Sequence, residues 1–86
     1  MSALDELKQR VSALAEDAER TSGELASFET EFSDASQKVA AEIGNTATGE
    51  DQEIIASLQA ASQALEQSVA ALQQASQSCN DFAQSL

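Results

Sequence analysis

The sequence predicts an all-α protein: an antiparallel two-helix hairpin that dimerises into a four-helix bundle. Three observations predict this fold. Strong helix formers dominate the composition and proline is absent. Apolar residues recur at spacings of three and four over most of the chain. One short segment rich in turn residues separates the two periodic stretches, so the helices are expected to run antiparallel within a single domain of 86 residues.

The first helix is expected at about residues 3–43, where a heptad pattern has two apolar positions. Ser2, followed by Asp5 three residues later, resembles an N-terminal capping box. The first apolar position contains Leu4, Val11, Ala18, Leu25, Phe32 and Val39, and the second apolar position contains Leu7, Leu14, Thr21, Phe28, Ala35 and Glu42. Spacings of three and four place both positions on one stripe of the helix. We therefore expect this stripe to be packed.

Charge spacing and one glycine bear on the continuity of this helix. Acid-before-base pairs at a spacing of four are Glu6–Arg10, Glu16–Arg20 and Asp34–Lys38. Each such pair stabilises an exposed helix face by about 0.2–0.5 kcal/mol. Gly23 opposes the helix, because glycine costs about 1 kcal/mol relative to alanine in a helix interior. The heptad phase does not shift across Gly23, which favours a continuous helix, bent or closely approached there, over a break at that residue.

A connecting segment is expected at about residues 44–49. Gly44 follows the last apolar residue of the first helix, where a left-handed C-terminal cap would lie. Thr48 is expected to cap the second helix, with Asp51 completing a Thr-x-x-Asp box. The predicted turn residues are Gly44, Ala47, Thr48 and Gly49.

The second helix is expected at about residues 50–84 and contains a near-repeat, SLQAASQ at 57–63 and ALQQASQ at 71–77. Its first apolar position contains Leu58, Leu65, Leu72, Cys79 and Leu86, and its second contains Ile54, Ala61, Ser68, Ala75 and Phe82. One hairpin would leave these stripes half exposed, so a second hairpin or another helical protein is expected to cover them. The residues expected at the partner interface are Leu25, Phe28, Phe32, Val39, Leu58, Leu65 and Leu72.

Residue types that support catalysis or metal binding are scarce. Histidine is absent and Cys79 is the only cysteine. Without histidine the chain has neither an activated nucleophile of the Cys–His type nor a Glu-x-x-His di-iron motif, and no Gly-rich phosphate loop occurs. We therefore expect a protein that is not an enzyme and holds no metal or cofactor. Cys79 is expected to be a small apolar residue of the stripe, and the alternative is an intermolecular disulfide after export.

The net charge of −11 arises from 15 acidic and 4 basic residues, and all four bases lie in the first half. Nucleic acid and anionic membrane surfaces are unfavoured partners, because both require clustered Lys and Arg. The acidity is expected to serve solubility, or else a basic partner. No apolar run typical of a signal peptide or a membrane span occurs. We expect a soluble protein in the cytoplasm, which uses no cleaved signal if it is secreted.

The chain resembles the small WXG-type helical hairpins associated with type VII secretion in actinobacteria and firmicutes. The resemblance lies in the length, the two antiparallel helices, the missing signal peptide and the segment TATGEDQEIIASLQAASQAL at 46–65. The family's Trp-x-Gly turn corresponds to Ala47, Thr48 and Gly49, so Ala47 stands where the family has Trp. The family's Tyr-x-x-x-Asp/Glu signal is missing, because Gln77 stands four residues before Asp81.

Members of this family form homodimers or heterodimers, and one partner of a heterodimer can carry the secretion signal for both. The resemblance implies a homodimer or a targeting partner of a larger exported protein. An alternative from the residues alone is a cytoplasmic coiled-coil adaptor with no secretion role. A third, less favoured reading is a polymerising subunit of an injection apparatus or phage.

Overall fold

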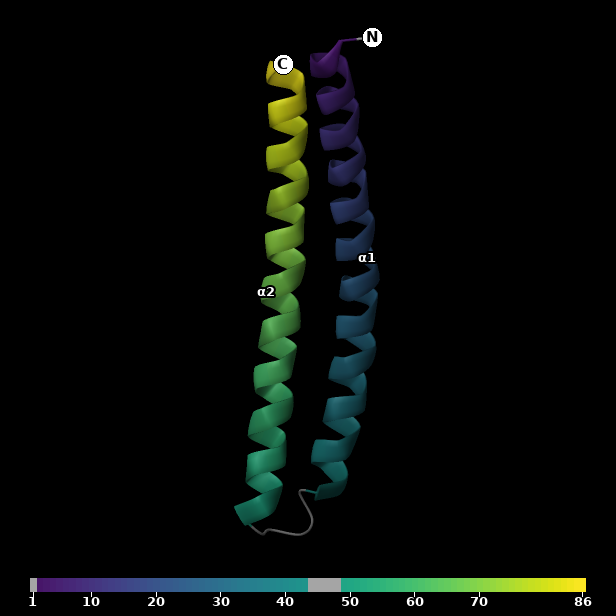
Figure 1. Ribbon diagram of the computed structural model, residues 1–86. Coiled ribbons are helices and arrows are strands. Elements are labelled where there is room, and N and C mark those ends of the chain that lie inside the picture. The colour runs from purple at the N-terminus through teal and green to yellow at the C-terminus, as the bar shows by residue number, and fades with distance from the viewer. Residues whose placement is uncertain (1, 44–48) are drawn as a thin grey trace.

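The protein is a hairpin of two long helices in the computed structural model (Figure 1). Helix α1 comprises Ala3–Ile43 and helix α2 comprises Gly49–Ser85. They run antiparallel and pack against each other in a rod with extents of 66 × 17 × 14 Å. The all-α hairpin predicted from the sequence is thereby confirmed.

The structure describes residues 2–43 and 49–86, and of residues 49–51 it describes the backbone alone. Gly44, Ala47 and Thr48 of the predicted turn lie outside the described residues, as does the expected cap between Thr48 and Asp51. Gly49 is the first residue of α2.

Helix α1 begins with a side-chain cap. The hydroxyl oxygen of Ser2 accepts a hydrogen bond of 3.2 Å from the backbone N–H of Asp5, and the carbonyl oxygen of Ser2 accepts one of 3.2 Å from Glu6. The Ser2 hydroxyl therefore satisfies one backbone donor that a helix start leaves without a helical partner, and the Ser2 carbonyl accepts the first hydrogen bond of the helix. Asp5 and Glu6 also complement the positive end of the helix dipole.

Helix α1 continues through Gly23 without a break. A Cβ atom added at Gly23 would meet nothing within 4 Å. No close approach of another element therefore requires a glycine here, and its effect on the helix is the entropic cost alone.

The contact between the two helices involves a third heptad position in each of them. In each helix, one residue directly follows each residue of the second apolar position. We call these following residues the inner position, starting at Ala15 in α1 and at Ile55 in α2. These residues are Ala15, Ser22, Glu29, Ser36 and Ile43 in α1, and Ile55, Ser62, Val69, Ser76 and Ala83 in α2. Every one of them is buried or half-buried, whereas every residue of the second apolar position is exposed in both helices.

The hairpin therefore encloses only part of the predicted apolar stripe, because the second apolar position faces outward. The reason is side-chain size. The most deeply buried residues of the contact are small, with Ala15 only 1% exposed and Ser76 only 6% exposed. Small side chains let two helix backbones approach closely, and two helices alone cannot enclose the larger Leu and Phe side chains on the neighbouring position.

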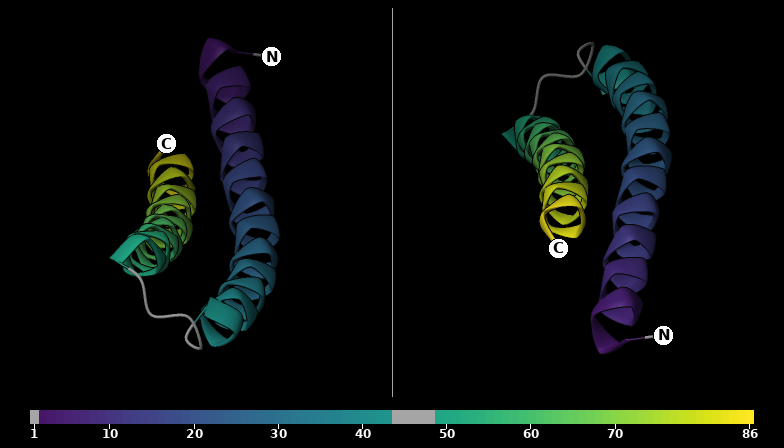
Figure 2. Two further views of the ribbon diagram at one scale, coloured as in Figure 1. Left: turned by 90° about the horizontal axis from the view of Figure 1, so that it is seen from below. Right: turned by 90° about the horizontal axis from the view of Figure 1, so that it is seen from above.

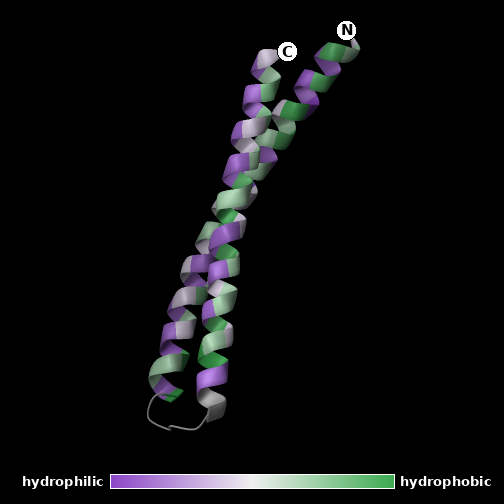
Figure 3. Ribbon diagram, turned by 90° about the vertical axis from the view of Figure 1, so that its left-hand side faces the viewer, coloured by the Kyte–Doolittle hydropathy of each residue, from purple (hydrophilic) through white to green (hydrophobic). Residues whose placement is uncertain are grey.

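The N-terminal turns of α1 lie apart from α2. All residues from 2 to 10 are exposed. The additional views show this end of α1 standing away from the C-terminal end of α2 (Figures 2 and 3). Leu4 and Leu7 are consequently left uncovered by the hairpin.

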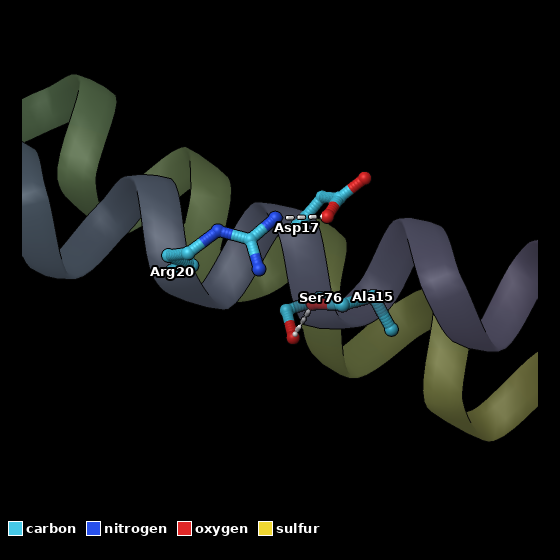
Figure 4. Close-up of polar contacts among 4 residues, drawn as sticks. All are labelled: Ala15, Asp17, Arg20 and Ser76. Carbon is cyan, nitrogen blue, oxygen red and sulfur yellow. Dashed lines mark hydrogen bonds and ion pairs between the residues drawn. The ribbon is translucent and has the colours of Figure 1, made fainter.

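One of the expected ion pairs forms with a different acid. Arg20 pairs with Asp17, three residues earlier, and not with Glu16 (Figure 4). The pairs expected for Arg10 and Lys38 do not form among the residues that the structure describes. Exposed pairs contribute little because water screens them, so α1 does not depend on these charges.

Candidate protein-binding face

The hairpin has a very small core of its own. Among the described residues, the buried apolar side chains are those of Ala15, Ala18 and Ala83. The accessible surface is 6269 Å². A compact monomer of 9.0 kDa is expected to expose about 4,900 Å², so this chain exposes about 1,400 Å² more. The elongated hairpin therefore leaves more surface in contact with water than a compact domain of the same mass.

The large apolar residues that remain exposed all belong to the first or second apolar position. They are Leu4, Leu7, Leu14, Phe28, Val39, Ile54, Phe82 and Leu86. Leu14 is 57% exposed and Phe28 is 50% exposed, so half of each side chain faces water. Coloured by hydropathy, apolar turns recur along the length of α1 (Figure 3).

The second apolar positions of both helices lie on the same side of the hairpin. In each helix this position precedes the inner position by one residue, so it is rotated from the inter-helix contact by the same angle and in the same sense. Because the helices run antiparallel, equal rotations about their two axes lead to the same side of the pair. The first apolar position lies between the other two. We call the two apolar positions of both helices together the apolar face.

Two phenylalanines lie near the middle of α1 on this face. The ring centroids of Phe28 and Phe32 are 6.0 Å apart, with an interplanar angle of 31°. Phe32 belongs to the first position and is half-buried, whereas Phe28 belongs to the second. Aromatic side chains carry much of the energy at protein interfaces, and this pair offers a broad apolar surface to a partner.

The residues predicted at a partner interface all lie on the apolar face. Five of them are half-buried: Leu25, Phe32, Leu58, Leu65 and Leu72. Phe28 and Val39 are exposed. That these residues contact a partner stays a prediction.

Sequence reasoning left other members of this face out of the predicted interface. Leu7, Leu14, Ile54 and Phe82 were recognised as heptad residues but not as interface residues. Their signal was present in the heptad pattern. The heptad pattern could not predict that these four side chains are exposed, because it does not show which position faces the other helix.

The opposite side of the inter-helix contact is polar. A groove between the helices is lined mainly by serine and glutamine, with no charged residue: Ser33, Ser36, Gln37, Ala40, Ile55, Leu58, Gln59, Ser62 and Gln63. Within the described residues, the hydroxyl oxygen of Ser36 is buried without a hydrogen-bond partner. The hairpin thus has one apolar side and one polar side, and a second groove on the polar side includes the charged Glu19.

The side chains that could support chemistry are dispersed. In residues 2–43 and 49–86, no group of three or more Asp, Glu, Cys or His side chains is placed to hold a metal ion. Cys79 is a free, half-buried cysteine at the first apolar position of α2. Neither of the helices, as far as they are described, has a stretch apolar enough to cross a membrane.

No family model, curated protein or solved structure matches the chain. The apolar face is therefore the feature from which a function can be argued.

Proposed function

We propose that this protein is a non-catalytic interaction protein that binds another helical protein through its apolar face. The exposure of the second apolar position in both helices is the observation that carries this proposal. Burying a Leu or Phe side chain is worth about 1.5–3 kcal/mol, so a face with several of them strongly favours association. The face runs along helices of 41 and 37 residues, and other long helices fit such a surface best.

We further propose, from the resemblance to WXG-type hairpins, that the protein acts in type VII secretion. It would serve there as a homodimer or as the targeting partner of a larger exported protein. In this role the chain folds in the cytoplasm and leaves the cell without a cleaved signal peptide. Ala47 in place of Trp, and Gln77 in place of Tyr four residues before Asp81, favour the partner that does not itself carry the secretion signal.

The alternative is a cytoplasmic coiled-coil adaptor with no secretion role. The observation that favours it is the exposure of acidic side chains along α1, including Asp17, Glu24 and Glu31. An acidic flank beside an apolar face suits a helical partner that has a basic flank. Retention of the protein in the cytosol of a cell with a working type VII system would favour this function over the secretion one.

Light scattering tests the proposed binding by comparing the mass of the chain alone with its mass after mixing with the product of a neighbouring gene. Either a homodimer or a one-to-one complex is expected. The decisive variant is Phe28→Asp, which places a charge in the middle of the apolar face. Its matched control is Ser27→Asp, which adds the same charge at an exposed site facing away from both α2 and the apolar face.

Phe28→Asp is expected to abolish the dimer or complex, and Ser27→Asp to leave it intact. Circular dichroism should show both variants helical, since neither residue lies at the inter-helix contact. Binding by Phe28→Asp that equals the binding of the unmodified chain would mean that the apolar face is not the interface.

A further inference from the structure

We infer that the occupant of the apolar face is a second copy of this chain, related by a two-fold axis parallel to the helices. In this arrangement each α1 lies antiparallel against α2 of the other copy. The inference rests on the proposed function, because it takes the apolar face as the binding surface. It adds the identity of the partner and the way in which the two copies meet.

The register of the hairpin follows from one hydrogen bond. The hydroxyl of Ser76 donates to the backbone carbonyl oxygen of Ala15 over 2.8 Å, so these two residues lie at the same height along the rod (Figure 4). Counting along the antiparallel helices from this level brings each second-position residue of α1 within two residues of one in α2, or about 3 Å in height. The pairs are Leu14 with Ala75, Thr21 with Ser68, Phe28 with Ala61, and Ala35 with Ile54. Leu7 and Phe82 share the last level, where α1 stands away from α2.

Three of these pairs combine a large side chain with a small one. A two-fold axis parallel to the helices keeps every residue at its own height while exchanging α1 for the partner's α2. Phe28 then meets the partner's Ala61, and Leu14 meets the partner's Ala75. Ile54 meets the partner's Ala35 in the same way. Large side chains set against small ones interdigitate without voids, which is how well-packed helical cores are filled.

The other face-to-face arrangement opposes small side chains over a longer stretch when its axis lies level with Ser68. A two-fold axis perpendicular to the helices would set α1 on α1 and α2 on α2. With the axis level with Ser68, the small residues Ala61, Ser68 and Ala75 of α2 would face the same three residues of the other copy. Small side chains opposite small ones leave a gap whose lining loses its contacts.

The charged residues beside the apolar face also distinguish the two arrangements. The residues just before the first apolar position flank the interface. In α1 they are all exposed, with three acids in the middle and a base on either side: Ala3, Arg10, Asp17, Glu24, Glu31 and Lys38. The equivalent residues of α2 are neutral: Ser57, Ala64, Ala71 and Ser78. Setting α1 on α2 places the three acids beside neutral residues, whereas setting the middle of one α1 on the middle of another would place acids opposite acids. Like charges that face each other across an interface disfavour it.

The dimensions of the face also suit a second copy. The accessible surface exceeds that of a compact monomer by about 1,400 Å², and a standard interface removes about 800 Å² from each partner. A second hairpin has the same helix lengths, so it covers the face from end to end. In the resulting bundle the first apolar position points to the centre, the inner position to the same copy and the second position to the other copy.

Cross-linking tests this arrangement in a Cys79→Ser background, which removes the native thiol. Thr21→Cys and Ser68→Cys are made separately, because both sites are exposed and small and lie within about 3 Å of one height. The two variants are mixed, allowed to exchange, and treated with a short bifunctional thiol cross-linker. A covalent dimer of twice 9.0 kDa is expected in the mixture, with at least a several-fold lower yield from either variant alone. Thr21→Cys mixed with Ala70→Cys, on the opposite side of α2, measures the collisional background.

Two outcomes would overturn the inference. Efficient cross-linking of Ser68→Cys to itself would show that α2 lies on α2. A monomeric mass by light scattering, with no cross-linking above the Ala70→Cys background, would show that a second copy does not bind. Either result would leave the proposed function supported if a different helical protein binds the chain and Phe28→Asp abolishes that binding.

Discussion

Ser76 of α2 donates a buried hydrogen bond of 2.8 Å from its hydroxyl to the backbone carbonyl oxygen of Ala15 in α1. The two residues are distant in sequence, and both are almost completely buried. Ala15 offers only a methyl group at this point, so the hydroxyl of Ser76 can reach its backbone. The bond both satisfies a buried polar group and sets the height of one helix against the other.

Removing this hydroxyl should weaken the hairpin moderately. Ser76→Ala is expected to lower the free energy of unfolding by about 0.5–1.5 kcal/mol, since the carbonyl of Ala15 keeps its helical hydrogen bond. Ser76→Leu should cost more, about 1–3 kcal/mol, because the larger side chain forces the helices apart. Urea unfolding followed by circular dichroism measures both. Ser78→Ala, at an exposed site on the same helix, is the control, and an equal loss there would contradict the role given to Ser76.

Gly23→Ala should stabilise the protein. The helix continues through Gly23 and an added methyl group would meet nothing within 4 Å, so only the entropic penalty of glycine is removed. The expected gain is about 0.5–1 kcal/mol. Thermal unfolding should show a higher midpoint for Gly23→Ala than for the control Ser27→Ala. A lower midpoint would mean that something outside the hairpin approaches Gly23 closely.

Phe28→Ala should destabilise the assembly and hardly affect the isolated hairpin. Phe28 is 50% exposed in the hairpin, so the single chain gains little from it. Full burial against a partner would make its truncation cost about 3–5 kcal/mol. The midpoint of thermal unfolding should therefore rise with protein concentration for the native chain and much less for the variant. Parallel concentration dependence in both would place Phe28 outside the interface.

Leu65→Ala should behave differently from Phe28→Ala. Leu65 lies at the first apolar position and is already half-buried in the single hairpin. Its truncation should lower the unfolding midpoint at low and high protein concentration alike, with a full cost of about 2–5 kcal/mol in the assembly. Urea unfolding at two widely separated concentrations distinguishes the two variants. A loss seen only at high concentration would assign Leu65 to the partner contact alone.

The neighbours of Arg20 show why some side-chain contacts were not predictable. Glu16 and Asp17 both lie within one turn of Arg20, and both spacings bring opposite charges together on a helix. The choice of Asp17 depends on the rotamers of exposed side chains, whose energies differ by little. The heptad pattern contains no information about it.

The sequence alone determined the two helices, the cap at Ser2 and the continuity of α1 through Gly23, because these depend on hydrogen bonds and spacings within a few residues. It also determined which residues form the apolar stripe. Only the tertiary structure decided which edge of that stripe faces the other helix. The small residues Ala15 and Ser76 let the backbones approach, and the larger Leu14 and Phe28 on the neighbouring position were left outside, since two helices cannot enclose them. That choice depends on the sizes of side chains brought together from distant parts of the chain, which the spacing along one helix does not reveal.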